Sequence, residues 1–227
     1  MQLNAAEREL TLKVVYYGPG LSGKTTNLQA IHARLDPNVR GRLMTLDTAD
    51  DRTLFFDMMP VFFQTASGLK VRLKLFTVPG QAMHDSTRRL VLQGVDAVAF
   101  IADSQINQSK ANNAYWSDLL KNLQQNGISP GEIPIVIQFN KRDLPETRTD
   151  EEIEGLRLKG KEPIFSAVAI RGIGVLETLH GLMLLTFARL EKKLDFGRKF
   201  GVTEEEFMRG IFRNLDLEDS DIEAAFG

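Results

Sequence analysis

The chain has 227 residues, of which 43% are hydrophobic and 26% are charged, and its formal net charge is -2. These values are typical of a globular protein with one domain and an addition, and they exclude a basic surface that would recruit nucleic acid or an anionic membrane nonspecifically. Because the sequence has no cysteine, disulfides, thiolate metal sites, prenylation and palmitoylation are also excluded.

Short apolar runs alternate with helical patterns along the chain, which predicts an α/β fold with a mostly parallel sheet. Six strands are predicted at Leu10 to Tyr17, Met58 to Thr65, Val71 to Thr77, Asp96 to Ala102, Ile133 to Phe139 and Glu162 to Val168. Helices are predicted at Lys24 to Leu35, His84 to Gln93, Asn107 to Asn126, Asp150 to Lys159 and Val175 to Leu194. The segment between the second and third strands is too short for a crossover helix. We therefore expect one antiparallel hairpin strand, with helices on both faces of the sheet.

The amino-terminal residues, Met1 to Asn4, contain neither a glycine for myristoylation nor the basic and apolar blocks of a signal peptide. No apolar run reaches the roughly 18 uncharged residues of a transmembrane helix. We expect a cytoplasmic protein without a lipid anchor or a transmembrane segment.

The composition changes after Asp195, so we divide the chain into a domain at 1–195 and an acidic helical extension at 196–227. From Thr203 onward there are eight acidic and two basic residues, and Phe207, Ile211 and Leu215 recur every four positions. This amphipathic pattern is typical of a helix that packs on its own domain, although it also fits a tail that docks to a partner.

The segment Gly18-Pro19-Gly20-Leu21-Ser22-Gly23-Lys24-Thr25 matches the phosphate-binding loop pattern, and it lies between a predicted strand and a predicted helix. The glycines allow the backbone amides and the helix N-terminus to surround an anion. Lys24 supplies positive charge for the terminal phosphates, and the Thr25 hydroxyl is a suitable ligand for Mg²⁺. We expect Thr26 to support the α-phosphate.

The segment Asn140-Lys141-Arg142-Asp143 follows the fifth predicted strand, and its residues indicate which nucleotide base the protein binds. The Asp143 carboxylate would accept from guanine N1–H and the exocyclic amine, whereas adenine would leave it unpaired. Asn140 would tie this loop to the phosphate loop, and the Lys141 stem would cover the base. A backbone amide of Ser166-Ala167-Val168 would meet guanine O6.

We expect the histidines and the aromatic pair at 115 and 116 to have structural roles. His32, His84 and His180 have no spacing that indicates a metal site or a catalytic triad. Tyr115 and Trp116 lie at helical spacing from Leu119, Leu120 and Leu123, so we interpret them as packing residues.

Several further segments agree with one family. They are Tyr16-Tyr17-Gly18-Pro19-Gly20-Leu21, Asp51-Arg52-Thr53-Leu54-Phe55-Phe56-Asp57, Thr77-Val78-Pro79-Gly80-Gln81 and Ala102-Asp103-Ser104-Gln105. On these residues the chain resembles the bacterial Ras-like small GTPases of the MglA type, over about Leu10 to Leu194. The resemblance implies a P-loop small GTPase fold, GTP and GDP as ligands with Mg²⁺, and a role in cell polarity or gliding motility. It also implies a Roadblock-fold activator of the MglB type and effectors at the cell poles, with the GTPase monomeric on its own.

The switch residues are predicted partly from mechanism. Thr53 would complete Mg²⁺ coordination in the GTP state, and Gln81, next to Gly80, would orient the attacking water. The resemblance implies that Arg52 is an arginine finger supplied in cis. Where Ras has an aspartate that supports Mg²⁺ this chain has Thr77, a change shared by MglA-type proteins. A scaffold that binds nucleotide without hydrolysing it is the alternative, but intact Lys24 and Thr25 disfavour it, as do Thr53 and Gln81.

Overall fold

The computed structural model of the chain describes residues 1–36, 42–45, 57–80, 85–213 and 215. Its strands are β1 (Gln2–Asn4), β2 (Glu9–Tyr17), β3 (Met44–Thr45), β4 (Asp57–Gln64), β5 (Lys70–Thr77), β6 (Ala97–Asp103), β7 (Ile135–Asn140) and β8 (Ile164–Ser166). Its α-helices are α1 (Lys24–Arg34), α2 (Asp85–Val91), α3 (Ser109–Gln125), α4 (Asp150–Lys159), α5 (Val175–Leu194), α6 (Phe196–Phe200) and α7 (Glu204–Phe212). Short 3₁₀ turns are η2 (Ile106–Gln108), η3 (Pro130–Glu132) and η4 (Ala169–Arg171).

All strands belong to one sheet, in the order β3-β4-β5-β2-β6-β7-β8, with β1 paired to β2 off this path. β2 is parallel to β5 and to β6, and the pairs β6–β7 and β7–β8 are also parallel. β4 is antiparallel to β5, and their connection is closed by the amide of Thr65, which donates to the carbonyl of Leu69 at 2.9 Å. The predicted α/β class and the hairpin are therefore confirmed.

The sheet has two strands that were not predicted. β1 has three residues and β3 has two, so neither is long enough to show the alternation of apolar and polar residues from which a strand is recognised. Both pair antiparallel with a longer neighbour, β1 with β2 and β3 with β4. In the described part of the chain, the sheet therefore has eight strands where six were predicted.

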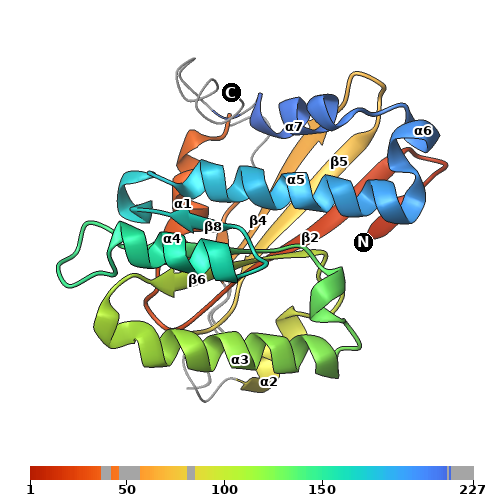
Figure 1. Ribbon diagram of the computed structural model, residues 1–227. Helices are drawn as coiled ribbons and strands as arrows, with labels where there is room; N and C mark the ends of the chain where they lie inside the picture. The colour runs from red at the N-terminus through yellow and green to blue at the C-terminus, as the bar shows by residue number, and fades with distance from the viewer. Residues whose placement is uncertain (37–41, 46–56, 81–84, 214, 216–227) are drawn as a thin grey trace.

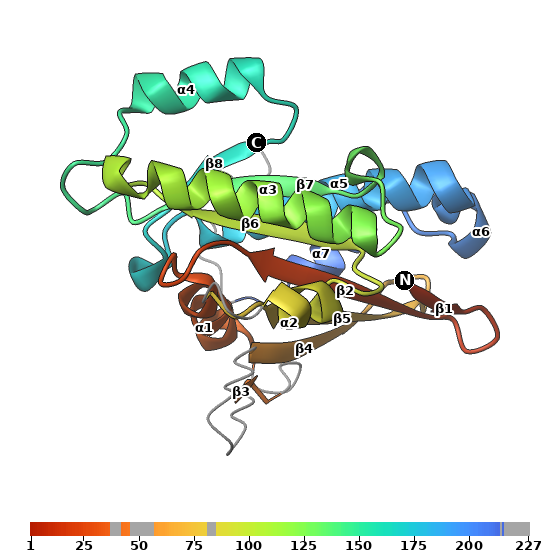
Figure 2. The same ribbon diagram turned by 90° about the horizontal axis from the view of Figure 1, so that it is seen from below.

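Helices cover both faces of the sheet, as Figures 1 and 2 show. α1, α5, α6 and α7 pack on one face and share a hydrophobic core with the inward side chains of β2, β4 and β5. α2, α3 and α4 contribute to a second core on the opposite face. The alternation along β2 shows the division, because Val14 and Tyr16 belong to the first core while Val15 and Tyr17 belong to the second.

The segment after α5 folds back over the sheet (Figure 1). α5 ends at Leu194, and Asp195 and Gly201, which flank α6, both have left-handed backbone conformations (φ 54° and 64°) that turn the chain. α7 then begins with a capping box, in which Thr203 and Glu206 each accept a hydrogen bond from the other's backbone amide. Its apolar side packs against β4 and α5. The helical pattern expected after Thr203 thus appears as α7, up to Phe212.

Candidate nucleotide-binding site

The loop between β2 and α1 has a backbone that only glycine accepts at two positions. Gly18 has φ 142°, and a Cβ there would lie 2.2 Å from the carbonyl oxygen of Ile101. Gly23, which precedes the first residue of α1, has φ 99°, and a Cβ there would lie 2.2 Å from Nδ2 of Asn140. These glycines let the loop curve tightly around the start of α1, the geometry by which backbone amides surround a phosphate.

Lys24 is the first residue of α1 and is buried, with 6% of its surface exposed. Its Nζ donates to the carbonyl oxygens of Gly18 at 3.0 Å and of Pro19 at 2.6 Å, so the ammonium group lies within the curve of the loop. The first turn of α1 contains no acidic residue. A buried ammonium at a helix N-terminus whose first turn has no acidic residue favours an anionic ligand.

Asn140, the last residue of β7, joins the phosphate loop to the segment after β8. Its Nδ2 donates to the carbonyl oxygen of Ser22 at 2.8 Å, and its Oδ1 accepts from the amide of Ala169 at 2.9 Å. The side chain is 3% exposed. The side-chain amide of Asn140 therefore fixes two segments relative to each other, one 118 residues and the other 29 residues from Asn140 along the chain.

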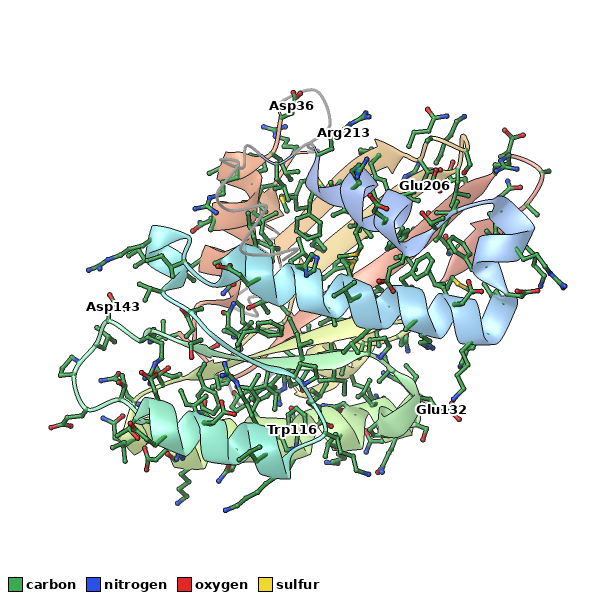
Figure 3. The ribbon with its side chains drawn as sticks, turned by 45° about the horizontal axis from the view of Figure 1, so that its top comes forward. Asp36, Trp116, Glu132, Asp143, Glu206 and Arg213 are labelled. Carbon is green, nitrogen blue, oxygen red and sulfur yellow. The ribbon has the colours of Figure 1, made fainter. Side chains whose placement is uncertain are left out.

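The residues after Asn140 are brought to the same edge of the sheet. Lys141 has a left-handed backbone (φ 67°), and its Nζ donates to Oδ2 of Asp103 at 2.7 Å, an ion pair that fixes the direction of its stem. Asp143 is exposed on the loop between β7 and α4, where Figure 3 shows it at the edge of the molecule. The structure therefore keeps this carboxylate free of burial and accessible to a ligand.

The segment expected to contact guanine O6 uses two of its amides within the protein. The amide of Ala167 donates to the carbonyl oxygen of Phe139 at 2.9 Å, and the amide of Val168 donates to that of Ile173 at 3.0 Å. A base contact from either amide would require one of these hydrogen bonds to be exchanged.

A polar network beneath the phosphate loop was not found from the sequence. Nδ2 of Asn27 donates to Oε1 of Gln138 at 2.9 Å, and Nε2 of Gln138 donates to the hydroxyl of Thr178 at 2.8 Å. Asn27 also donates to the carbonyl oxygen of Gly23 at 2.9 Å. Gln138 is the one polar side chain before Asn140 in the otherwise apolar strand β7. A polar residue within an apolar strand was the sequence feature from which this buried network could have been predicted.

The switch residues Arg52, Thr53 and Gln81 lie outside the described residues, as does His84. Gly80 is described, and it packs on Gly20 of the phosphate loop: a Cβ on Gly80 would lie 2.4 Å from the Gly20 Cα. Thr25 is exposed and Thr77 is buried at the end of β5. Within the described part of the chain, no three histidine, cysteine or acidic residues cluster.

A loop with the phosphate-binding pattern between β2 and α1, on a mostly parallel sheet with Asn140 at the end of β7 and Asp143 in the loop that follows, defines a P-loop small GTPase fold. Comparison with known proteins agrees. No family model matches the chain, but it is 45% identical over 190 residues to the mutual gliding-motility protein MglA of Myxococcus xanthus (strain DK1622), which covers 84% of this chain and 97% of that protein. The chain belongs to the MglA family of small GTPases. None of the described helices is long and apolar enough to cross a membrane.

Proposed function

We propose that this chain is a guanine-nucleotide switch that binds GTP and GDP with Mg²⁺ and hydrolyses GTP slowly. The observation that supports it most is the double hydrogen bond of Asn140, which joins the phosphate loop at Ser22 to the segment at Ala169. Because the side chain links the two halves of one site, a ligand with phosphates at one end and a base at the other fits this arrangement better than a phosphate alone.

The phosphates would lie against the loop that precedes α1. Its amides, at Gly18, Gly20, Leu21, Ser22 and Gly23, would surround the β-phosphate, with Lys24 bound to the terminal phosphates and Thr26 to the α-phosphate. The buried ammonium of Lys24 supports this role, since two of its partners are carbonyl oxygens that phosphate oxygens would replace or join. Thr25 and Thr53 would hold Mg²⁺, which neutralises charge on the phosphates when bound.

The base would lie between Lys141 and the segment Ser166-Ala167-Val168. Asp143 would read guanine by accepting from N1–H and the exocyclic amine. The Lys141–Asp103 ion pair supports the base position, because it fixes the direction of the apolar stem of Lys141, two residues before Asp143 in the chain. Discrimination against adenine follows from the cost of about 1–3 kcal/mol, more for a charged group, of leaving a polar group without partners.

Hydrolysis would depend on residues beyond the described part of the chain. Gln81 would orient the attacking water and Arg52 would neutralise charge in the transition state. Thr53 and Gly80 would respond to the γ-phosphate, so the two nucleotides would produce two conformations.

A Roadblock-fold activator of the MglB type would stimulate hydrolysis, and effectors would read the GTP state, with recruitment to cell poles through these partners. The 45% sequence identity to a protein named for gliding motility supports a role in motility or polarity. The chain would be monomeric in the absence of these partners.

Equilibrium binding of fluorescent GTP and GDP to Asp143→Asn tests the base assignment. We expect affinity for both nucleotides to fall at least tenfold, since a charged acceptor of two donors becomes a neutral amide. Asp150→Asn is the matched control, because Asp150 is a nearby carboxylate that is 88% exposed and pairs only with Arg142 among the partners given by the structure. Unchanged affinity in Asp143→Asn would overturn guanine reading by this residue.

A further inference from the structure

Gly80 lies directly beside the ammonium group of Lys24. A Cβ added to Gly80 would lie 2.7 Å from the Gly20 amide nitrogen and 3.0 Å from Lys24 Nζ, so a side chain has no room there. The backbone of Gly80 is therefore among the groups nearest to the position that a terminal phosphate would take on Lys24.

The carbonyl oxygen of Gly80 is held by a side chain from α3. The Tyr115 hydroxyl donates to it at 2.7 Å, across 35 positions of sequence. Within the described residues this is the only hydrogen bond of Gly80, so its amide N–H has no acceptor there. An unpaired backbone N–H next to an ammonium group is a donor suited to an anion.

The ring of Tyr115 is itself oriented by a buried network. The Arg88 guanidinium of α2 lies 5.3 Å from the centroid of the Tyr115 ring, and its Nε donates to Oδ2 of Asp118 at 2.8 Å. Tyr17, the last residue before the phosphate loop, donates its hydroxyl to the same oxygen. Arg88 is 4% exposed and the Asp118 side chain is 20% exposed, so this arrangement is partly shielded from solvent.

The protonation state of the Tyr115 hydroxyl suits its hydrogen bond to the Gly80 carbonyl oxygen. Burial raises its pKa above the ordinary value, although the nearby Arg88 opposes the rise. The group is consequently a protonated donor at neutral pH. Tyr115 and Trp116 both pack against the second core, as the sequence predicted, and Trp116 lies edge-on against Phe100 with centroids 5.1 Å apart. The sequence interpretation omitted only the additional hydrogen bond of the Tyr115 hydroxyl.

We infer that Tyr115 is a positioning residue: by holding the carbonyl of Gly80, it keeps the Gly80 N–H directed to the terminal phosphate of GTP. The inference rests on the proposed function, and it adds a residue on α3 that distinguishes GTP from GDP without touching either nucleotide. Its effect acts only on the nucleotide that has a γ-phosphate, since GDP offers no acceptor at that position.

The test measures the affinities of wild type, Tyr115→Phe and Trp116→Phe for slowly hydrolysed GTP analogues and for GDP, each with Mg²⁺. Tyr115→Phe removes the hydroxyl and keeps the ring over Arg88. We expect its affinity for the GTP analogue to fall about three- to tenfold, the effect of one lost hydrogen bond, with GDP affinity unchanged. Trp116→Phe perturbs the same helix on its packing side and should leave the ratio of the two affinities at the wild-type value.

Equal losses for both nucleotides in Tyr115→Phe would show a merely structural role and overturn the inference, as would an unchanged ratio. The same change of ratio in Trp116→Phe would also overturn it, because the effect would then come from any disturbance of α3. Failure of the proposed function is a different result: the wild-type protein itself would bind neither guanine nucleotide, and the inference would fall with it.

Discussion

The ring of Phe207 in α7 packs edge-on against the ring of Phe63 in β4, with the centroids 5.9 Å apart and the planes at 76°. Phe207 is fully buried, and its ring also lies 5.4 Å from that of Phe187 in α5. α7 is therefore joined to the main hydrophobic core through an aromatic cluster, and it covers β4, a strand of the β4–β5 hairpin.

Phe207→Ala should destabilise the whole protein, because it empties a site among aromatic rings. We expect a loss of about 3–5 kcal/mol in the free energy of unfolding, measured by urea denaturation. Glu205→Ala in the exposed side of the same helix is the control and should change stability by less than about 0.5 kcal/mol. Equal stability of Phe207→Ala and wild type would mean that α7 is not part of the folded core.

His180 of α5 predicts a pH dependence of stability. Its ring lies 5.3 Å from that of Phe212 in α7, and burial lowers its pKa below the ordinary value of 6.5. The unfolded chain therefore takes up a proton at higher pH than the folded chain does. The associated stability is fully present above about pH 6.5 and is lost as pH falls through the lowered folded value.

His180→Leu removes this titration. Denaturant midpoints compared between about pH 7 and pH 5 should fall less steeply in the variant than in the wild type, since the remaining titratable groups are the same in both proteins. Parallel curves for the two proteins would contradict the account of His180.

Asn140→Ala should weaken the site as a whole. It leaves the Ser22 carbonyl and the Ala169 amide without their partner and separates the two segments that Asn140 joins. We expect affinity for GTP and for GDP to fall together, at least tenfold, in contrast to the GTP-selective effect of Tyr115→Phe. Asn113→Ala, at an exposed position of α3, is the control. A selective loss of one nucleotide would contradict a purely connecting role.

Gly18→Ala should abolish nucleotide binding, since the added methyl would meet the backbone oxygen of Ile101 at 2.2 Å. Gly94→Ala has the same kind of backbone strain, with φ 66°, but nothing lies within 4 Å of the added Cβ. This matched control should lose some stability and keep its nucleotide affinity. Comparable binding by Gly18→Ala and wild type in calorimetric titration would refute the requirement for glycine in the loop.

Much of the fold was predictable, because its determinants are local. The apolar runs of β2, β5 and β6 and the uninterrupted pattern of α5 give element type directly, and the boundaries of α4 and α5 agree with the sequence prediction. β1 and β3 exist only through pairing with β2 and β4, so no local pattern indicates them. The loop between β2 and α1 could be selected from its spacing as a candidate phosphate-binding loop, and that role stays a prediction. The contact between Tyr115 and Gly80 depends on the packing of α3 and α2 against the sheet, which no short motif encodes.

The most direct test of the account is single-turnover hydrolysis of GTP by the purified protein with Mg²⁺, comparing wild type with Gln81→Ala and using ATP as the control nucleotide. The account predicts slow hydrolysis of GTP, none of ATP, and loss of the GTP reaction in Gln81→Ala. Hydrolysis of both nucleotides at similar rates, or a rate for Gln81→Ala equal to that of the wild type, would contradict it. GTP that stays bound and intact in the wild type, even with a Roadblock-fold activator present, would point instead to a scaffold that binds nucleotide without hydrolysing it.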